Sequence, residues 1–295
     1  MSTRTWIVAA LAVTTLGVSA PPGLAASVRS SHGHIVFTDT AQRVNDVTVI
    51  RESGRIRFRD AAVAPTAGAG CAPAGQNRVS CPAHGVRSIT LRLGPGGDQV
   101  IIRPHLLVHA IEIQGGPGAD AVKTGGPAIS AFGGGGNDRL HGGPLADLLQ
   151  GGDGDDNLRS ADGPDILLGK HGDDLAIAGS GRDLVFGEGD DDELYGRAGN
   201  DILRGATGED IVIDLHGVDR LYGGADADYL NTKDGETGDF QNAGAGPDYG
   251  CAASPFPGDV LIGCDERAGP CCILPRDLPE LLLLSQMAVS RSYEG

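Results

Sequence analysis

Eleven aspartates recur at every ninth residue in the middle of this 295-residue chain. They are Asp138, Asp147, Asp156, Asp165, Asp174, Asp183, Asp192, Asp201, Asp210, Asp219 and Asp228. Carboxylate oxygens are hard donors. Calcium prefers six or more of them, whereas magnesium demands a tighter octahedron and softer metals prefer nitrogen or sulfur. Carboxylates at a fixed period therefore indicate repeated binding of a hard cation.

The residues around these aspartates repeat with the same period. Eleven units without a gap fill residues 133–231, beginning GGGGNDRLH, GGPLADLLQ, GGDGDDNLR and ending GGADADYLN. The sixth position is always aspartate and the eighth always aliphatic, while glycine holds the first position in eight units and the fourth in eight. Glycine permits positive φ angles and close backbone approach. Each unit therefore predicts a six-residue turn followed by a three-residue strand.

These units resemble the RTX, or haemolysin-type, calcium-binding repeat G-G-x-G-x-D-x-U-x. The resemblance covers about a third of the chain. It implies a parallel β-roll in which two units form one coil and calcium lies between turns eighteen residues apart. One stack would join Asp138, Asp156, Asp174, Asp192, Asp210 and Asp228, and the other Asp147, Asp165, Asp183, Asp201 and Asp219. Several calcium ions are expected, about nine at most in the uninterrupted array.

The array extends upstream but contains imperfect turns. GGPGADAVK adds Asp120 in the same register, Ile129 stands where the next aspartate belongs, and Asp98 is a ligand candidate out of register. The fourth glycine is replaced by Leu145, Asp190 and Asp226, and the unit that begins at Asp214 lacks the first glycine. We expect weaker calcium binding at these four turns.

The charge of the chain agrees with cation binding. Asp and Glu outnumber Lys and Arg by 39 to 23, which gives a net charge of -16, and residues 133–231 hold 22 acidic and 7 basic residues. This balance disfavours nucleic acid and anionic lipid as partners. Aspartates stacked about 5 Å apart repel one another by about 1 to 3 kcal/mol per pair. We therefore expect the roll to be largely disordered until calcium binds.

The first residues predict a secretory signal peptide. Arg4 precedes an apolar run from Trp6 to Val18, and small residues follow, so cleavage near Ala25 or Ala26 fits. The alternative, an uncleaved membrane anchor, is disfavoured because the run is shorter than the ~20 residues that a spanning helix needs. The mature protein is expected to be extracellular and to lack a membrane span.

The cysteines agree with export. Cys71 and Cys81 bracket one loop, and Cys251 and Cys264 bracket a second, so two local disulfides are the simplest pairing in an oxidising compartment. Cys271 and Cys272 are left over, and they could cross-link chains, pair with each other or stay reduced.

The fold prediction is all-β: a parallel β-roll or β-helix solenoid of nonapeptide repeats between two end units. Residues 1–26 are the signal peptide, 27–105 a small β-rich amino-terminal capping module, 106–231 the roll, 232–270 a disulfide-closed carboxy-terminal cap, and 271–295 a tail. In the module, Val47–Ile50 and Arg55–Arg59 predict a hairpin, and Ile89 and Leu91 alternate with polar residues.

Calcium binding with calcium-dependent folding is the predicted function, without enzymatic activity. An adhesive or cell-surface structural role, with a surface polymer as partner, is an alternative, and a secreted hydrolase carrying an RTX module is a weaker one. His105 and His109 have the spacing of a zincin, but no glutamate follows His105 and the segment predicts a strand. Ser180 lacks the first glycine of a G-x-S-x-G elbow.

Overall fold

The structure is a computed structural model that describes residues 26–41, 43–62, 64–232, 237–252 and 260–262. These residues form 26 strands and contain no helix, which confirms the all-β prediction. Consequently no helix in this part of the chain could cross a membrane.

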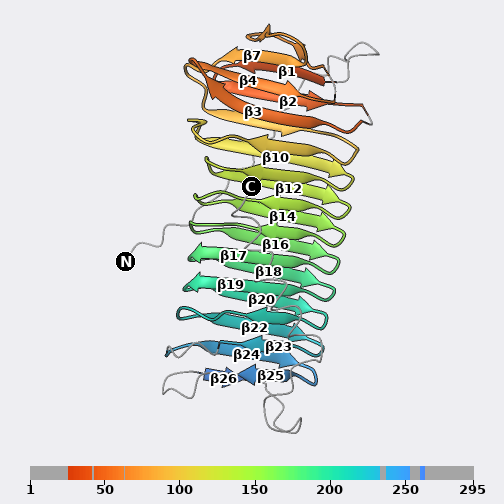
Figure 1. The fold of residues 1–295 in the computed structure, drawn as a ribbon. Coiled ribbons are helices and arrows are strands. Elements are labelled where there is room, and N and C mark those ends of the chain that lie inside the picture. The colour runs from red at the N-terminus through yellow and green to blue at the C-terminus, as the bar shows by residue number, and fades with distance from the viewer. Residues whose placement is uncertain (1–25, 42, 63, 233–236, 253–259, 263–295) are drawn as a thin grey trace.

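The strands form two sheets of thirteen strands each, named here sheet 1 and sheet 2. Sheet 1 has the order β26 (Val260–Ile262), β24 (Phe240–Ala245), β22 (Arg220–Ala225), β20 (Ile202–Thr207), β18 (Leu184–Gly189), β16 (Ile166–His171), β14 (Leu148–Asp153), β12 (Ile129–Gly135), β10 (Ala110–Pro117), β8 (Ser88–Arg92), β2 (His34–Asp39), β1 (Ala26–Ser31) and β5 (Thr66–Ala67). Sheet 2 has the order β25 (Tyr249–Ala252), β23 (Tyr229–Asn231), β21 (Ile211–Ile213), β19 (Glu193–Gly199), β17 (Leu175–Gly181), β15 (Asn157–Arg159), β13 (Arg139–His141), β11 (Ala121–Thr124), β9 (Gln99–Ile102), β3 (Asp46–Glu52), β4 (Arg55–Asp60), β7 (Arg78–Pro82) and β6 (Ala72–Pro73). Figure 1 shows the resulting stack of coils.

From β8 and β9 onward the neighbouring strands are parallel, and through the repeats their register is eighteen residues. Leu149 pairs with Leu167 in sheet 1, and Leu140 pairs with Leu158 in sheet 2. Two nine-residue units therefore make one coil, as the resemblance implied. The chain is a parallel β-solenoid, and the fold class predicted for the repeats is confirmed.

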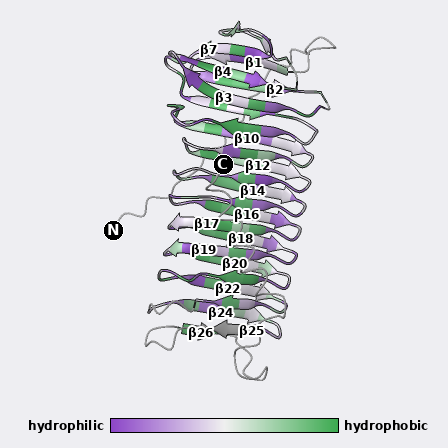
Figure 2. Cartoon of the chain, in the orientation of Figure 1, coloured by the Kyte–Doolittle hydropathy of each residue, from purple (hydrophilic) through white to green (hydrophobic). Residues whose placement is uncertain are grey.

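The core lies between the two sheets. The eighth residue of every repeat unit is 0% exposed, so one aliphatic side chain per strand stacks directly on its counterpart in the next coil. Figure 2 shows hydrophobic segments recurring from strand to strand along the stack. Each coil is thin and contributes few large side chains, so its apolar burial alone stabilises it weakly.

The amino-terminal strands join the same two sheets through antiparallel hairpins. β1 pairs with β2 and β3 with β4, while β2 and β3 also pair in parallel with β8 and β9. The predicted hairpin between β3 and β4 is confirmed, and Ser53 and Gly54 turn it with φ of 50° and 73°. Phe37 and Phe58, both 0% exposed, give this end a denser core than the repeats have.

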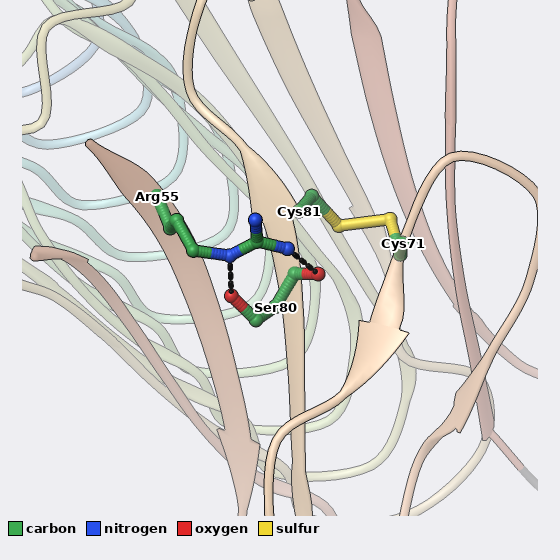
Figure 3. The surroundings of a disulfide bond; sticks show 4 residues. All are labelled: Arg55, Cys71, Ser80 and Cys81. Carbon is green, nitrogen blue, oxygen red and sulfur yellow. Dashed lines mark hydrogen bonds between the residues drawn. A yellow bond between two sulfur atoms is a disulfide. The ribbon is translucent and has the colours of Figure 1, made fainter. Parts of the chain in front are cut away.

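A disulfide closes the loop before β7, as predicted. Cys71 is bonded to Cys81, and their Cα atoms are 4.3 Å apart. Beside it, the Arg55 guanidinium donates hydrogen bonds to the hydroxyl and the carbonyl oxygen of Ser80, as Figure 3 shows. The disulfide and these bonds tie β4, β7 and the loop together at the end of the solenoid.

At the other end, β24, β25 and β26 extend the solenoid beyond the repeats. β22 pairs with β24 at a spacing of twenty residues, because two extra residues enter the connection before β24. The side chain of Cys251 and all of Cys264 lie outside the described residues, as do residues 1–25 of the predicted signal peptide, Cys271, Cys272 and the rest of the tail. The predictions made for them stay predictions.

Candidate metal centre

One turn, between β14 and β15, shows how a repeat places its aspartate. Gly152 and Gly154 lie in the left-handed region, with φ of 134° and 114°. A Cβ on Gly152 would lie 2.1 Å from the carbonyl oxygen of Gly134 one coil earlier, so only glycine allows the coils to stack this closely. The turn ends with Asp156 buried and with Leu158, two residues on, in the core.

The aspartates form two rows along the solenoid. The long aspartate row consists of Asp98, Asp120, Asp138, Asp156, Asp174, Asp192, Asp210, Asp228 and Asp248, and the short aspartate row of Asp147, Asp165, Asp183, Asp201, Asp219 and Asp239. Within each row, the backbone N–H of one aspartate donates to Oδ1 of the aspartate in the next coil, at 2.7 to 3.2 Å. Every member is at most 3% exposed. The structure therefore brings together the two stacks that the sequence predicted.

The second carboxylate oxygen, Oδ2, is buried without a hydrogen-bond partner in much of these rows. This holds for Asp98, Asp120, Asp138, Asp156, Asp174, Asp183, Asp192, Asp210 and Asp228. In the turn of Asp156, a Cβ on Gly151 would lie 1.9 Å from Oδ2, so the first glycine of the unit makes room for the carboxylate. A buried carboxylate oxygen without a donor is costly unless a cation pairs with it. These oxygens therefore fit a metal ion.

Burial raises the pKa of most row aspartates above the ordinary value of 3.8. The pKa is about 6 for Asp138 and Asp183, about 7 for Asp120, Asp156, Asp165, Asp174, Asp210 and Asp228, and about 8 for Asp192. Neighbouring aspartates add to this for most of them, and the hydrogen bond to Oδ1 opposes it. Without a cation, full ionisation at neutral pH is unfavourable, whereas a bound cation stabilises the ionised rows.

An exposed acidic edge accompanies the long aspartate row and was missed by the sequence reasoning. It consists of the fifth residues of alternate units: Asn137, Asp155, Asp173, Asp191 and Glu209. Each backbone N–H after the first donates to the side-chain oxygen one coil earlier, at 2.8 to 3.2 Å. On the short row, the corresponding positions include Pro164, Arg182 and Val218. The eighteen-residue period could have revealed this asymmetry.

Two interruptions sit at the start of the short aspartate row. Ile129 donates its backbone N–H to Asp147 at 2.8 Å but contributes no carboxylate, as expected. At Leu145 the turn lacks the usual glycine, and the Gly143 N–H donates to Oδ2 of Asp147 at 2.6 Å. Because a turn amide already donates to that oxygen, Asp147 is expected to bind a cation more weakly than the row aspartates whose Oδ2 lacks a donor.

The other imperfect turns keep their geometry. Asp190 and Asp226 replace fourth-position glycines yet adopt φ of 73° and 79°. The turns therefore keep the left-handed residue that the repeat requires, at the energetic cost of placing a non-glycine residue there. Asp190 gains a contact in return, since its Oδ2 accepts the Gly172 N–H at 2.9 Å.

Asp214 is the one residue at the first position of a repeat unit that has a charged side chain. Its side chain is 1% exposed and lies with Asp201 and Asp219 in a group whose ligand atoms are within 4.8 Å of one another. Burial, followed by the charges of Asp219 and Asp201, raises the pKa of Asp214 to about 9, and the nearby His216 amide opposes the shift.

Three row members lie outside the repeat register: Asp98, which the sequence offered as a ligand candidate, and Asp239 and Asp248, which the sequence reasoning missed. Asp98 is in the long aspartate row despite its spacing of 22 residues from Asp120. Asp239 and Asp248 continue the two rows at a spacing of twenty residues. For Asp248 a partial signal was present in AGAGPDYGC, which has the fourth-position glycine and the sixth-position aspartate of the repeat once a shift of two residues is allowed.

The residues weighed for catalysis lie apart from the aspartate rows. His105 and His109 are exposed in the connection between β9 and β10, so the expectation that they belong to a strand was wrong. Pro104 cannot donate to the sheet, and His105 has φ of 66°, so the strand ends before them. Ser180 lies in β17, and its hydroxyl donates to Asp162 one coil earlier.

These features define a class: a parallel β-solenoid whose turns carry buried carboxylates suited to hard cations. Residues 132–167, 168–203 and 204–236 match the family model of the RTX calcium-binding nonapeptide repeat, over about a third of the chain. This stretch therefore consists of RTX-type calcium-binding repeats, as the sequence indicated. No curated protein and no solved structure matches the chain.

Proposed function

We propose that this protein is an extracellular calcium-binding protein, not an enzyme, whose β-roll folds when calcium binds. The observation that carries the proposal is the pair of aspartate rows, with buried oxygens that lack donors. The ligands are Asp120 and the eleven aspartates at the sixth position of the repeats. Calcium is the cation because oxygen donors alone converge on these turns.

Electrostatics supports the coupling of folding to calcium. The raised pKa values of the rows show that burying ionised carboxylates costs free energy. The small side chain that each strand contributes to the core returns only a few kcal/mol per coil. Binding of calcium to the folded form alone therefore shifts the equilibrium toward the roll.

Export by the general secretory route supports an extracellular site of action. The apolar run after Arg4 predicts a signal peptide, and the disulfide between Cys71 and Cys81 suits an oxidising compartment. Amino-terminal sequencing of the exported protein tests this route. A new end near Ala25 or Ala26 is expected, and an intact Met1 would refute it.

A second function, adhesion to a surface polymer, is favoured by the outer face of sheet 1. Leu148, Ile166, Leu184 and Ile202 stack there at outward-facing positions, and Ile166 is 37% exposed. A row of partly exposed aliphatic side chains could serve as a binding surface. Calcium-dependent retention on cell-wall polysaccharide would support this role.

The deciding experiment is a calcium titration of chelator-treated mature protein, followed by far-UV circular dichroism, with magnesium as the control. Calorimetry gives the stoichiometry. We expect a cooperative gain of β signal with several ions bound, and no such gain with magnesium. A spectrum that is already folded in chelator and unchanged by calcium would refute the proposal.

A further inference from the structure

Asp214 introduces a carboxylate where the repeat has none. It is the first residue of the unit DLHGVDRLY, and eight of the eleven units have glycine at this position. The other two exceptions, Ser160 and Ala178, have small side chains. The RTX motif assigns no ligand to this position, so the proposed function does not account for Asp214.

The fold provides room for this side chain. Gly196 is the corresponding residue one coil earlier, and a Cβ there would lie 1.9 Å from Oδ2 of Asp214 and 2.9 Å from Oδ2 of Asp201. Only a glycine at 196 therefore lets the Asp214 carboxylate lie beside Asp201. Asp219, five residues after Asp214, completes the group from the same unit.

The group is buried, and no cationic side chain in the described part of the chain balances the charge of Asp214. Asp201 and Asp219 are 0% exposed and Asp214 is 1% exposed. Neither carboxylate oxygen of Asp214 accepts a hydrogen bond of normal geometry, and no cationic side chain pairs with it in the described part of the chain. A buried carboxylate of this kind is strongly unfavourable unless a cation compensates for its charge.

The three carboxylates lie close enough to share one ion. Their ligand atoms are within 4.8 Å of one another. Calcium accepts hard oxygen donors at about 2.3 to 2.6 Å in flexible geometry, whereas magnesium demands a near-ideal octahedron and gives up its water reluctantly. A donor set of carboxylates in an irregular arrangement therefore favours calcium.

We propose that Asp201, Asp214 and Asp219 together hold one additional calcium ion, in a site inside the roll that the repeat motif does not create. Three carboxylates supply more negative charge than the aspartates of two successive repeat turns. This ion is consequently held more tightly than one bound by two row aspartates alone, and it fixes β19 and β21 against each other near the carboxy-terminal end of the repeats.

The test counts the calcium ions that remain after dialysis against a buffer of low free calcium, by atomic emission. Asp214→Gly restores the repeat consensus, so it removes the carboxylate while favouring the fold, and Asp214→Asn keeps the side-chain size. Ala178→Gly is the matched control, because it makes the same change toward glycine in another coil without removing a carboxylate. Circular dichroism in saturating calcium confirms that each variant is folded.

We expect both Asp214 variants to retain one ion fewer than the wild type, and Ala178→Gly to retain as many. Equal counts in the wild type and both Asp214 variants would overturn the site while leaving calcium binding by the repeats intact. If the wild type holds a single ion and Asp214→Gly holds none, the site stands and the repeat array is refuted. A wild type that binds no calcium would refute both.

Discussion

Replacing Asp192 with asparagine should change stability in opposite directions with and without calcium. Burial raises the pKa of Asp192 to about 8. Relative to its ordinary value of 3.8, keeping this carboxyl protonated in the calcium-free roll at pH 7 costs about 4 kcal/mol. Asparagine removes that cost and can still accept the Asp174 N–H through Oδ1, which is 2.9 Å away.

The net effect is smaller because the new amide has a cost of its own. Its N–H₂ group would occupy the buried position of Oδ2, where an unsatisfied donor costs about 1 to 3 kcal/mol. We therefore expect Asp192→Asn to stabilise the calcium-free roll by about 1 to 3 kcal/mol at pH 7. In saturating calcium the same change removes a charged ligand, and a loss of about 3 to 5 kcal/mol is expected.

Circular dichroism can measure both effects. In chelator, a stabilising osmolyte drives folding, and the variant should fold at a lower osmolyte concentration than the wild type. In calcium, urea should unfold the variant at a lower concentration. Asp191→Asn is the matched control, since the neighbouring Asp191 is exposed and its loss should change stability little in either condition. If Asp192→Asn destabilises the chelated protein, the assignment of the cost to the buried charge is wrong.

Three further outcomes are expected. Without calcium, the aspartates of the folded rows keep their protons up to a pH of about 6 to 8, whereas those of the unfolded chain lose them near 3.8. The folded state therefore binds more protons than the unfolded state between these pH values, and osmolyte-driven folding should become harder as pH rises from about 4 to 8. Folding that becomes easier over this range would contradict the burial argument. Gly151→Ala should reduce calcium binding because its Cβ would lie 1.9 Å from Oδ2 of Asp156, whereas Gly135→Ala, with nothing within 4 Å, should bind calcium like the wild type in calorimetry. Replacing Cys71 and Cys81 with serine should lower stability in calcium by about 2 to 3 kcal/mol in urea unfolding, and a reductant should then have no further effect on that variant.

The period of the sequence predicted most of the fold and the stacking of the repeat aspartates into two rows. An invariant aspartate at the sixth position and an aliphatic residue at the eighth fix both the buried row and the core, because each coil repeats the same environment. The sequence reasoning missed the row members that follow an insertion into the nine-residue period. Asp239 and Asp248 rejoin the rows after an insertion of two residues, as the strand register and the hydrogen bonds across coils show.

The role of Asp214 could not be read from the repeat either. From the motif alone, the replacement of glycine by Asp214 predicted only weaker calcium binding at that turn. Its closeness to Asp201 depends on Gly196 one coil earlier, a relation between residues in different units that the motif of a single unit does not express.

The hairpins at the amino-terminal end have a consequence for the order of folding. Phe37, Phe58 and the disulfide give that end a core that does not depend on the aspartate rows. It offers the edges of β8 and β9 as a ready template, so the first coil can add to an existing sheet and avoids the cost of nucleation. The coils would then fold one after another from this end, because each folded coil provides the strand edges with which the next coil pairs.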